Sequence, residues 1–489
     1  MQPNVFSDED RATAAAERRA IDASCRGPVL WFLLSGTAWL LLGSVLGILT
    51  AIKFTHPEFL GNLAVLSFGP LRMAHLNAVA YGWMSMAAVA VGIWLMCRLS
   101  RAELLHPTML KAACVIWNIG VFAGVSGIIR GQATSVEWLE FPRYAPPFLI
   151  AALAIVVAWT VATFSRRREY HIYVSQWYIL GALFWMPWLY TVANFMIHWV
   201  PVTGVVQAGT NWWFAHNVLG LWLTPIGLGA AYYFIPKVIG RPIYSYHLSL
   251  IGFWTLALFY AWAGMHHLIG GPIPAWLATA SVVGSMMMFI PVIAVAVNHH
   301  LTMIGHFRVL RYSPTLRFVV FGSISYTLAS FQGSIEALKS VNQTTHFTDY
   351  TVGHAHLGVY AFFSMIMFGS AYYIVPRLTG REWASPGLIA LHFWSSALGI
   401  TVYFVALTIG GWFQGQMLND PSVLFADIVR YLEPYRFART VGGSLMTVGH
   451  VCFALLLLIN ICGWSRPALG RQNFTDTRTH ELAGVGGAA

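Results

Sequence analysis

Residues 349–378 read DYTVGHAHLGVYAFFSMIMFGSAYYIVPRL, and the fold class follows from them. Apart from Asp349 and Arg377 the stretch carries no formal charge, and it exceeds the roughly 20 apolar residues that cross a bilayer as a helix. Its histidines, His354 and His356, stand two residues apart, so on a helix they point about 200° away from each other. These two imidazoles can therefore bind two metals on opposite sides of one membrane helix, but not the same metal.

Similar apolar stretches recur along all 489 residues, of which 57% are hydrophobic and 9% charged, with a mean hydropathy of +0.63. Typical soluble domains carry about 25% charged residues. We therefore expect an all-α polytopic membrane protein. Its twelve predicted spans are 28–53, 72–97, 107–129, 144–165, 172–198, 205–235, 247–268, 274–298, 316–338, 350–376, 386–410 and 438–463.

The basic residues predict the orientation of these spans. Arginine and lysine gather in alternate connections, such as Arg166–Arg168, whereas the connections 199–204 and 269–273 have none. Because positive loops stay inside, both termini are expected in the cytoplasm. The formal charge of +10 then reflects membrane topology and not binding to nucleic acid.

The ends of the chain and its cysteines limit what else it can contain. We expect a cytoplasmic segment at 1–27 without an apolar signal region, a twelve-helix domain at 28–465, and a disordered cytoplasmic tail at 466–489. The five cysteines form no CxxC pair. The chain therefore offers no site for a covalent c-type haem and no cysteine pair for a dinuclear copper centre.

Six of the histidines inside the predicted spans stand out, because all six lie in the outer half of the membrane. Ionisable residues at such positions are functional candidates by default, although a single one can simply bond to a neighbouring helix. Two of them are adjacent near a helix end, where both imidazoles can reach one small ion such as copper, iron or zinc. The six are His75, His216, His266, His267, His354 and His356.

The spacing predicts two large cofactors that flank the helix of residues 350–376, and one small metal between spans 205–235 and 247–268. Six further histidines are expected to be ordinary interfacial or structural residues. They are His106, His247, His299, His300, His306 and His392.

Five motifs resemble the catalytic subunit of cbb3-type (C-family) cytochrome c oxidases, in the haem-copper oxidase superfamily. The resemblance covers the second to the tenth predicted span and implies a twelve-helix haem-copper oxidase bundle in a bacterial inner membrane. Besides residues 349–378, the motifs are LRMAHLNAVAYG (71–82), NWWFAHNVLGLWLTPIGLGAAYYFIPK (211–237), GRPIYSYHLSLIGFW (240–254) and FYAWAGMHHL (259–268).

The resemblance implies a role for each histidine. His75 and His356 would be the axial ligands of a low-spin haem b, and His354 the proximal ligand of a high-spin haem b3. His216, His266 and His267 would hold the copper ion that faces haem b3. Arg72 would pair with a haem propionate; the alternative is an ordinary interfacial arginine.

The same family places a redox-active tyrosine, here Tyr260, in a covalent bond with the copper ligand His216. Tyr260 and His216 are thus the expected catalytic residues. The family's single proton channel would run through Tyr246, Ser249, Tyr326 and Ser330, although such hydroxyls often only join helices.

Two positions depart from the family pattern. Gln332 stands where the family has a glutamate, which leaves Glu336, one turn further on, as a possible substitute. Met265 replaces a proline before the paired histidines. The proton or charge role that the family gives to this glutamate is therefore left unassigned in this chain.

The implied reaction is the reduction of O2 to water with electrons from cytochrome c, coupled to proton translocation. Mono-haem and di-haem cytochrome c subunits and small membrane subunits would be the partners. A nitric oxide reductase with non-haem iron is the alternative enzyme; the turn Asn217–Gly220 after His216 has no acid, and this favours an oxidase. A non-catalytic haem protein would not need the site of His216, His266 and His267.

Overall fold

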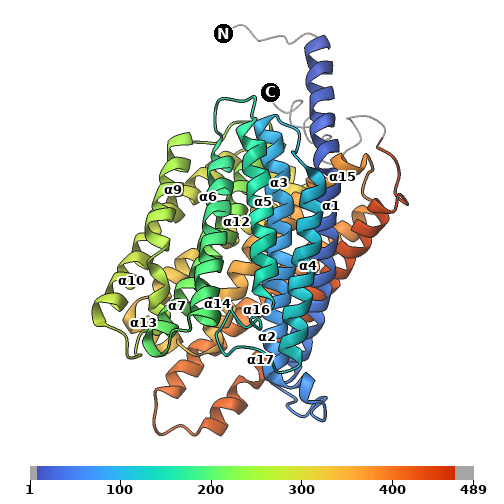
Figure 1. Ribbon diagram of the computed structural model, residues 1–489. Coiled ribbons are helices and arrows are strands. Elements are labelled where there is room, and N and C mark those ends of the chain that lie inside the picture. The colour runs from blue at the N-terminus through green and yellow to red at the C-terminus, as the bar shows by residue number, and fades with distance from the viewer. Residues whose placement is uncertain (1–7, 469–489) are drawn as a thin grey trace.

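The computed structural model describes residues 8–468, and the regular elements in this range are helices. One isolated β-bridge pairs Arg381 with Pro467. The helices stand side by side in one bundle, and the start of the first and the end of the last lie at the same end of it (Figure 1). In lipid, a helix pairs its backbone groups internally, which explains why apolar runs of this length adopt it.

Eleven helical stretches of the described residues are long and apolar enough to cross a membrane. A shorter apolar helix, α9 (Tyr246–Tyr260), continues through the 3-10 segment η5 (Ala263–Leu268) and supplies the twelfth. The predicted fold class is confirmed, and the twelve predicted spans agree broadly with these eleven stretches and the shorter helix. The other elements are α1 (Asp8–Ile52), η1 (Ala64–Leu66), α2 (Phe68–Asn77), η2 (Ala78–Met84), α3 (Ser85–Ser100), α4 (Pro107–Ile129), α5 (Pro146–Ser165), α6 (Val174–Asn194), η3 (Phe195–Trp199), α7 (Gly204–Asn217), η4 (Val218–Leu223), α8 (Thr224–Ile239), α10 (Ala275–Met287), α11 (Phe289–Met303), η6 (Phe307–Arg311), α12 (Pro314–Glu336), α13 (Lys339–Thr345), α14 (Asp349–His356), η7 (Leu357–Ser364), α15 (Met365–Thr379), α16 (Pro386–Leu418) and α17 (Phe425–Ile461).

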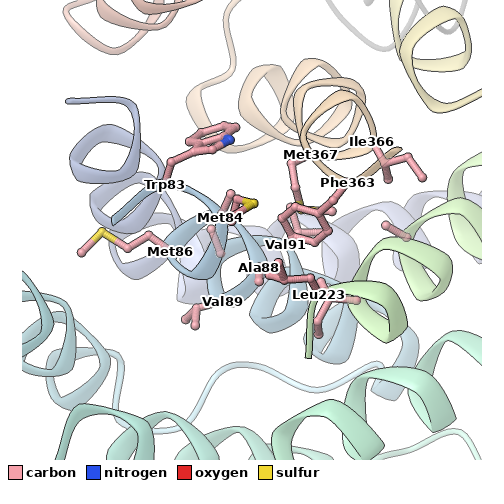
Figure 2. Close-up of a cluster of buried hydrophobic side chains, with 14 of the residues drawn as sticks. Trp83, Met84, Met86, Ala88, Val89, Val91, Leu223, Phe363, Ile366 and Met367 are labelled. Carbon is pink, nitrogen blue, oxygen red and sulfur yellow. The ribbon is translucent and has the colours of Figure 1, made fainter. Parts of the chain in front are cut away.

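Three spans form the centre of the bundle: Phe68–Ser100, Gly204–Ile239 and Asp349–Thr379. Buried residues make up 94%, 89% and 89% of their most apolar stretches, against 33–50% in the other eight. Figure 2 shows where they meet, with Trp83, Leu223 and Phe363 in one cluster of buried side chains. The three central spans carry four of the six predicted histidine ligands.

Each central span contains a π-helical segment that starts one to three residues after one of these histidines, as η2, η4 and η7. There the backbone bonds reach five residues back: the N–H of Ser85 donates to Ala80, that of Thr224 to Leu219, and that of Met365 to Tyr360. A π-helical turn inserts one extra residue and is frequent at functional sites.

The helix α1 begins at Asp8, twenty residues before the predicted start of the first span. This early part carries charges, so hydropathy gives no sign of it. Its residue Asp22 accepts hydrogen bonds from Trp94 Nε1 (3.0 Å) and Arg98 (3.2 Å), which attach it to α3. Within the predicted tail, Arg466 and Ala468 pair with the backbone next to Arg381, and residues 469–489 lie outside the described part of the chain.

The predicted loop at 411–437 is mostly helical, because α16 runs to Leu418 and α17 starts at Phe425. In Figure 1 this helical hairpin projects from the bundle at the end opposite the start of α1. The residues of α17 before 438 include several charges, among them Arg436, whose Nε lies 3.1 Å from Asp349 Oδ2. A hydropathy pattern detects the apolar part of a helix, not a polar extension of it.

Candidate functional site

A cavity of about 460 Å³ opens among the three central spans, and its walls also include residues of α1, α9, η5, α10, α12 and α17. All six predicted histidine ligands line it, together with Arg72, Tyr260, Tyr326 and Ser330. Tyr246 and Ser249 do not belong to its lining. The structure therefore brings together histidines that the sequence separates by up to 281 positions, from His75 to His356.

His216 on α7 and the pair His266 and His267 on η5 face one another. Each offers an imidazole nitrogen, and these three atoms lie within 4.8 Å of one another. A Cβ at Gly264 would collide with the backbone oxygen of Trp212, so the glycine lets η5 approach α7. The Trp212 ring stacks on His267 with centroids 4.0 Å apart and fixes the plane of this imidazole.

The hydrogen bonds of these histidines leave ring nitrogens for a metal. His266 Nδ1 lies 2.9 Å from Ser285 Oγ, a contact that orients the ring and directs Nε2 to the other two. His216 Nδ1 is buried and has no hydrogen-bond partner among the described residues. Buried polar atoms are normally paired, so this orphaned nitrogen fits a metal ligand. Three neutral imidazoles suit copper or iron.

Tyr260 at the end of α9 stands against the His216 ring, with centroids 4.3 Å apart and planes 28° apart. A Cβ at Gly220 would overlap the Tyr260 ring. Glycine at 220 therefore makes room for the phenol beside the three histidines. No acidic side chain stands in the turn Asn217–Gly220.

His75 and His356 occupy the other part of the cavity. Their Nδ1 atoms lie 2.7 Å from the Gly43 oxygen and 2.9 Å from the Val352 oxygen. Because a carbonyl only accepts, each Nδ1 carries the hydrogen, which makes Nε2 the ligand atom of each ring. His356 Nε2 lies 3.4 Å from the Tyr403 hydroxyl. A Cβ at Gly47 would collide with the His75 ring, so this glycine lets α1 lie close to the histidine.

His354 contacts a side chain, whereas His75 and His356 bond to backbone oxygens. Its Nδ1 lies 3.4 Å from Gln332 Oε1 on α12, and a Cβ at Gly333 would meet its ring. Glu336 instead accepts a hydrogen bond from Thr351 Oγ1 at 2.7 Å. The neutral Gln332, and not Glu336, is therefore the neighbour that bonds to His354.

Arg72 forms an ion pair with Glu137 in the loop between α4 and α5. A second acid of this loop, Glu140, is 1% exposed and accepts a hydrogen bond from Asn77 Nδ2 at 2.9 Å. Burial raises the pKa of Glu140 to about 7, although the Asn77 bond opposes this shift. Sequence reasoning missed both acids because they lie in a polar loop, where acidic residues are common.

The four residues of the predicted proton path do not form one continuous ladder. Tyr326 and Ser330 line the cavity, and the Tyr326 hydroxyl is buried with no hydrogen-bond partner among the described residues. Ser249 Oγ donates to the Tyr246 backbone oxygen at 2.6 Å, and Tyr246 donates to the Ile172 oxygen at 2.7 Å. No hydrogen bond among the described residues thus joins the pair Tyr246 and Ser249 to the pair Tyr326 and Ser330.

Residues 27–445 match the family described as cytochrome c and quinol oxidase polypeptide I. The chain is 32% identical to the cbb3-type cytochrome c oxidase subunit CcoN1 of Stutzerimonas stutzeri, over 86% of this chain and 92% of that protein. It is also 32% identical to cytochrome c oxidase subunit 1 of Rhodobacter capsulatus, over 89% of this chain and 85% of that protein.

More distant similarities agree with this fold. A nitric oxide reductase polypeptide of Stutzerimonas stutzeri is 23% identical over 85% of this chain and 90% of that protein. A solved heme-copper terminal oxidase dimer superposes with a TM-score of 0.68 at 16% identity, over 94% of this chain and 90% of that one. The motifs, the cavity and these relatives agree: the chain belongs to the cytochrome c and quinol oxidase polypeptide I family and is a membrane-embedded subunit I of a cbb3-type haem-copper oxidase.

Proposed function

We propose that this subunit reduces O2 to water at a centre of haem b3 and copper. His354 would hold the haem iron, and His216, His266 and His267 the copper. The observation that carries the proposal is the set of three imidazole nitrogens within 4.8 Å of one another, in the same cavity as His354.

Electrons from cytochrome c would reach this centre through a low-spin haem b held by His75 and His356. The backbone bonds at Nδ1 support this assignment, because they orient both rings and make Nε2 the nitrogen that would bind the haem iron. Arg72, already paired with Glu137, would bind a haem propionate by one side of its guanidinium group.

When bound, haem and copper supply the electron transfer that breaks the O–O bond. The residues of the chain would orient the ligand rings and supply protons. Ser285 fixes the ring of His266, and Tyr260 places a phenolic proton beside His216.

Tyr260 and His216 would be joined covalently, between a ring carbon of the tyrosine and Nε2 of the histidine. Nδ1 of His216, the nitrogen without a hydrogen-bond partner among the described residues, is then the copper ligand. Forming the bond removes two protons and two electrons, and O2 undergoing turnover accepts them.

Proton delivery and partners complete the proposal. Protons for water formation would enter near Tyr246 and Ser249 and reach Tyr326 and Ser330 at the cavity, coupled to translocation. Mono-haem and di-haem cytochrome c subunits would bring the electrons, because the chain has no CxxC motif, and small membrane subunits would complete the complex. Both termini would face the cytoplasm of a bacterium.

Nitric oxide reduction is the second candidate, supported by the 23% identity to the nitric oxide reductase polypeptide. In that case the three histidines would hold non-haem iron. An iron site gains from an oxygen ligand, and the cluster of imidazoles includes no carboxylate among the described residues. This observation favours copper.

Elemental analysis of the purified complex and an oxygen electrode test the choice. We expect one copper for each high-spin haem, with oxygen uptake that cyanide inhibits. Iron in excess of haem, without copper and with consumption of nitric oxide, would establish the reductase instead.

A further inference from the structure

A second group of buried polar side chains, separate from the six histidine ligands, surrounds His450 on α17. His450 Nδ1 lies 2.7 Å from Ser44 Oγ on α1, and Nε2 lies 2.8 Å from the Tyr360 hydroxyl on η7. The Tyr360 hydroxyl also lies 3.0 Å from Ser396 Oγ on α16, which can accept its hydrogen when His450 does not. Side chains from four elements thus form one hydrogen-bonded group, which we call the His450 cluster.

The His450 cluster borders the cavity near His75 and His356. Ser44 follows Gly43, whose oxygen bonds His75 Nδ1, and Tyr360 comes four residues after His356 in the same span. Ser44, Tyr360 and His450 all belong to the cavity lining. His450 is only 5% exposed. An ionisable side chain inside a membrane is costly and marks a functional position by default, and imidazole is the side chain whose charge changes near neutral pH.

The hydrogen bonds of the cluster suit both protonation states of His450. Ser44 Oγ donates its hydrogen to the Leu40 oxygen at 2.7 Å, so it accepts from His450 Nδ1. In the neutral ring Nε2 therefore accepts from Tyr360. If Nε2 gains a proton, it donates to the Tyr360 oxygen, and the Tyr360 hydrogen turns to Ser396. His450 can then gain and lose a proton without losing a hydrogen bond, which removes much of the usual cost of a buried polar group.

A second histidine continues the cluster toward the end of the bundle where α17 stops. His392 Nδ1 lies 2.8 Å from the Tyr372 hydroxyl, and its Nε2 is buried with no hydrogen-bond partner among the described residues. A Cβ at Gly449 would touch Ser395, Ser396 and the His392 ring together, so these groups face one point. At 1.5 Å per residue, His392 lies about 9 Å inside α16 and His450 about 17 Å before the end of α17.

The surroundings of His450 supply few charges that could fix its state. α1 presents Ser44, η7 and α15 present Tyr360 and Tyr372, and α16 presents His392. Two cationic side chains come from the neighbouring elements: Arg317 on α12 acts electrostatically on Tyr372, and Arg439 on α17 lines the same cavity. No carboxylate among the described residues bonds to the cluster. A positive charge on His450 is therefore best balanced by negative charge that enters the cavity.

We propose that His450 is a redox-linked proton site: it takes up one proton when an electron enters the haem between His75 and His356, and releases it when the electron leaves. The inference rests on the proposed function, which places that haem. One electron and one proton arrive and depart together, so charge balances and no other reactant is needed. Opposite charges attract strongly in a low-dielectric interior, and this attraction links the two events. His392 and Tyr372 mark the side from which the proton comes.

The test is a redox titration of the low-spin haem in the purified complex at several pH values. In the wild type we expect the midpoint potential to fall as pH rises; full coupling corresponds to a tenfold change in the reduction equilibrium per pH unit, about 59 mV for one electron. His450→Gln, which cannot gain the proton, should lose at least half of this dependence. An unchanged dependence in a variant with both haems would overturn the proposal.

His299→Gln is the matched control. His299 is 2% exposed, and its Nδ1 lies 2.8 Å from Ser323 Oγ, but it does not line the cavity. Its replacement should leave the pH dependence of the low-spin haem as in the wild type. If the wild type shows no low-spin haem in its optical spectrum, the proposed function fails before the titration begins.

A second measurement covers the case in which His450→Gln does not accumulate. Redox-difference infrared spectra of wild-type complex with ¹⁵N-labelled histidine should show an imidazole gaining a proton as the low-spin haem is reduced. Tyr360→Phe removes the oxygen that accepts the hydrogen bond from the protonated Nε2 of His450, and it should therefore shift that signal. Absence of the signal, or a signal that Tyr360→Phe leaves unchanged, would contradict the proposal.

Discussion

His75 is held by the Gly43 oxygen on one side and by Gly47 against its ring. His75→Ala should abolish the low-spin band of the reduced haem and leave a haem that binds carbon monoxide, because His354 is a separate ligand. Optical spectra with and without carbon monoxide measure both. His106→Ala, outside the cavity, is the control, and a low-spin spectrum that survives His75→Ala would show the assignment to be wrong.

The contact between Tyr260 and His216 predicts a cross-linked peptide. Since the rings stack with centroids 4.3 Å apart, mass spectrometry of digested active enzyme should find the two segments joined, two hydrogens lighter than their sum. Tyr260→Phe should yield two separate peptides. Separate, unmodified peptides from active wild-type enzyme would exclude the bond.

Glu140 predicts a pH dependence of stability. Its pKa is raised from 4.5 to about 7 by burial, so the folded protein binds this proton more tightly than the unfolded chain. Stability is therefore lost as pH rises from 4.5 towards 7. Glu140→Gln should reduce this loss, measured as the thermal unfolding temperature in detergent across that range. The half-exposed Glu137 serves as the control position, and identical profiles for Glu140→Gln and wild type would contradict the prediction.

Among the elements, the spans were predictable and their local irregularities were not. An average over apolar residues finds a span such as Asp349–Thr379, but it does not show the extra residue of η7, because π-helical and α-helical turns contain the same kinds of side chain. Hydropathy did not predict the polar start of α17 for a related reason. Its charges lie outside the apolar run, and the segment becomes recognisable only through its packing against α16.

The gap between the ends of the proton path gives a prediction for α9 and α12. Ser249→Ala with Tyr326→Phe should slow turnover several-fold while haem content stays near that of the wild type, because Tyr326 is the path residue whose buried hydroxyl faces the cavity. Oxygen uptake and haem spectra are the measurements. Thr255→Ala, on an exposed face of α9, is the control. Unaltered turnover in the double variant would show that these hydroxyls only pack helices together.

For the whole molecule, the histidines at one predicted depth were enough to anticipate a shared site, and the structure places all six around one cavity. The sequence could not reveal residues whose role depends on tertiary contact alone. Glu140 is an ordinary loop acid until Asn77 and burial define it, and His392, expected to be structural, stands beside the His450 cluster only through the packing of α16 against α17.

The π-helical segments also determine which changes of chain length the fold can accept. Each π-helical turn holds one residue more than an α-helical turn. Removing one residue from η2 would therefore let it close into α-helix, with His75 before it and Met86 after it still on their present faces. The same holds for η4 and η7. A one-residue deletion elsewhere in these spans would instead turn every side chain beyond it by about 100° and shorten the helix by about 1.5 Å, so either the histidine would leave the cavity or the residues beyond it would leave the core.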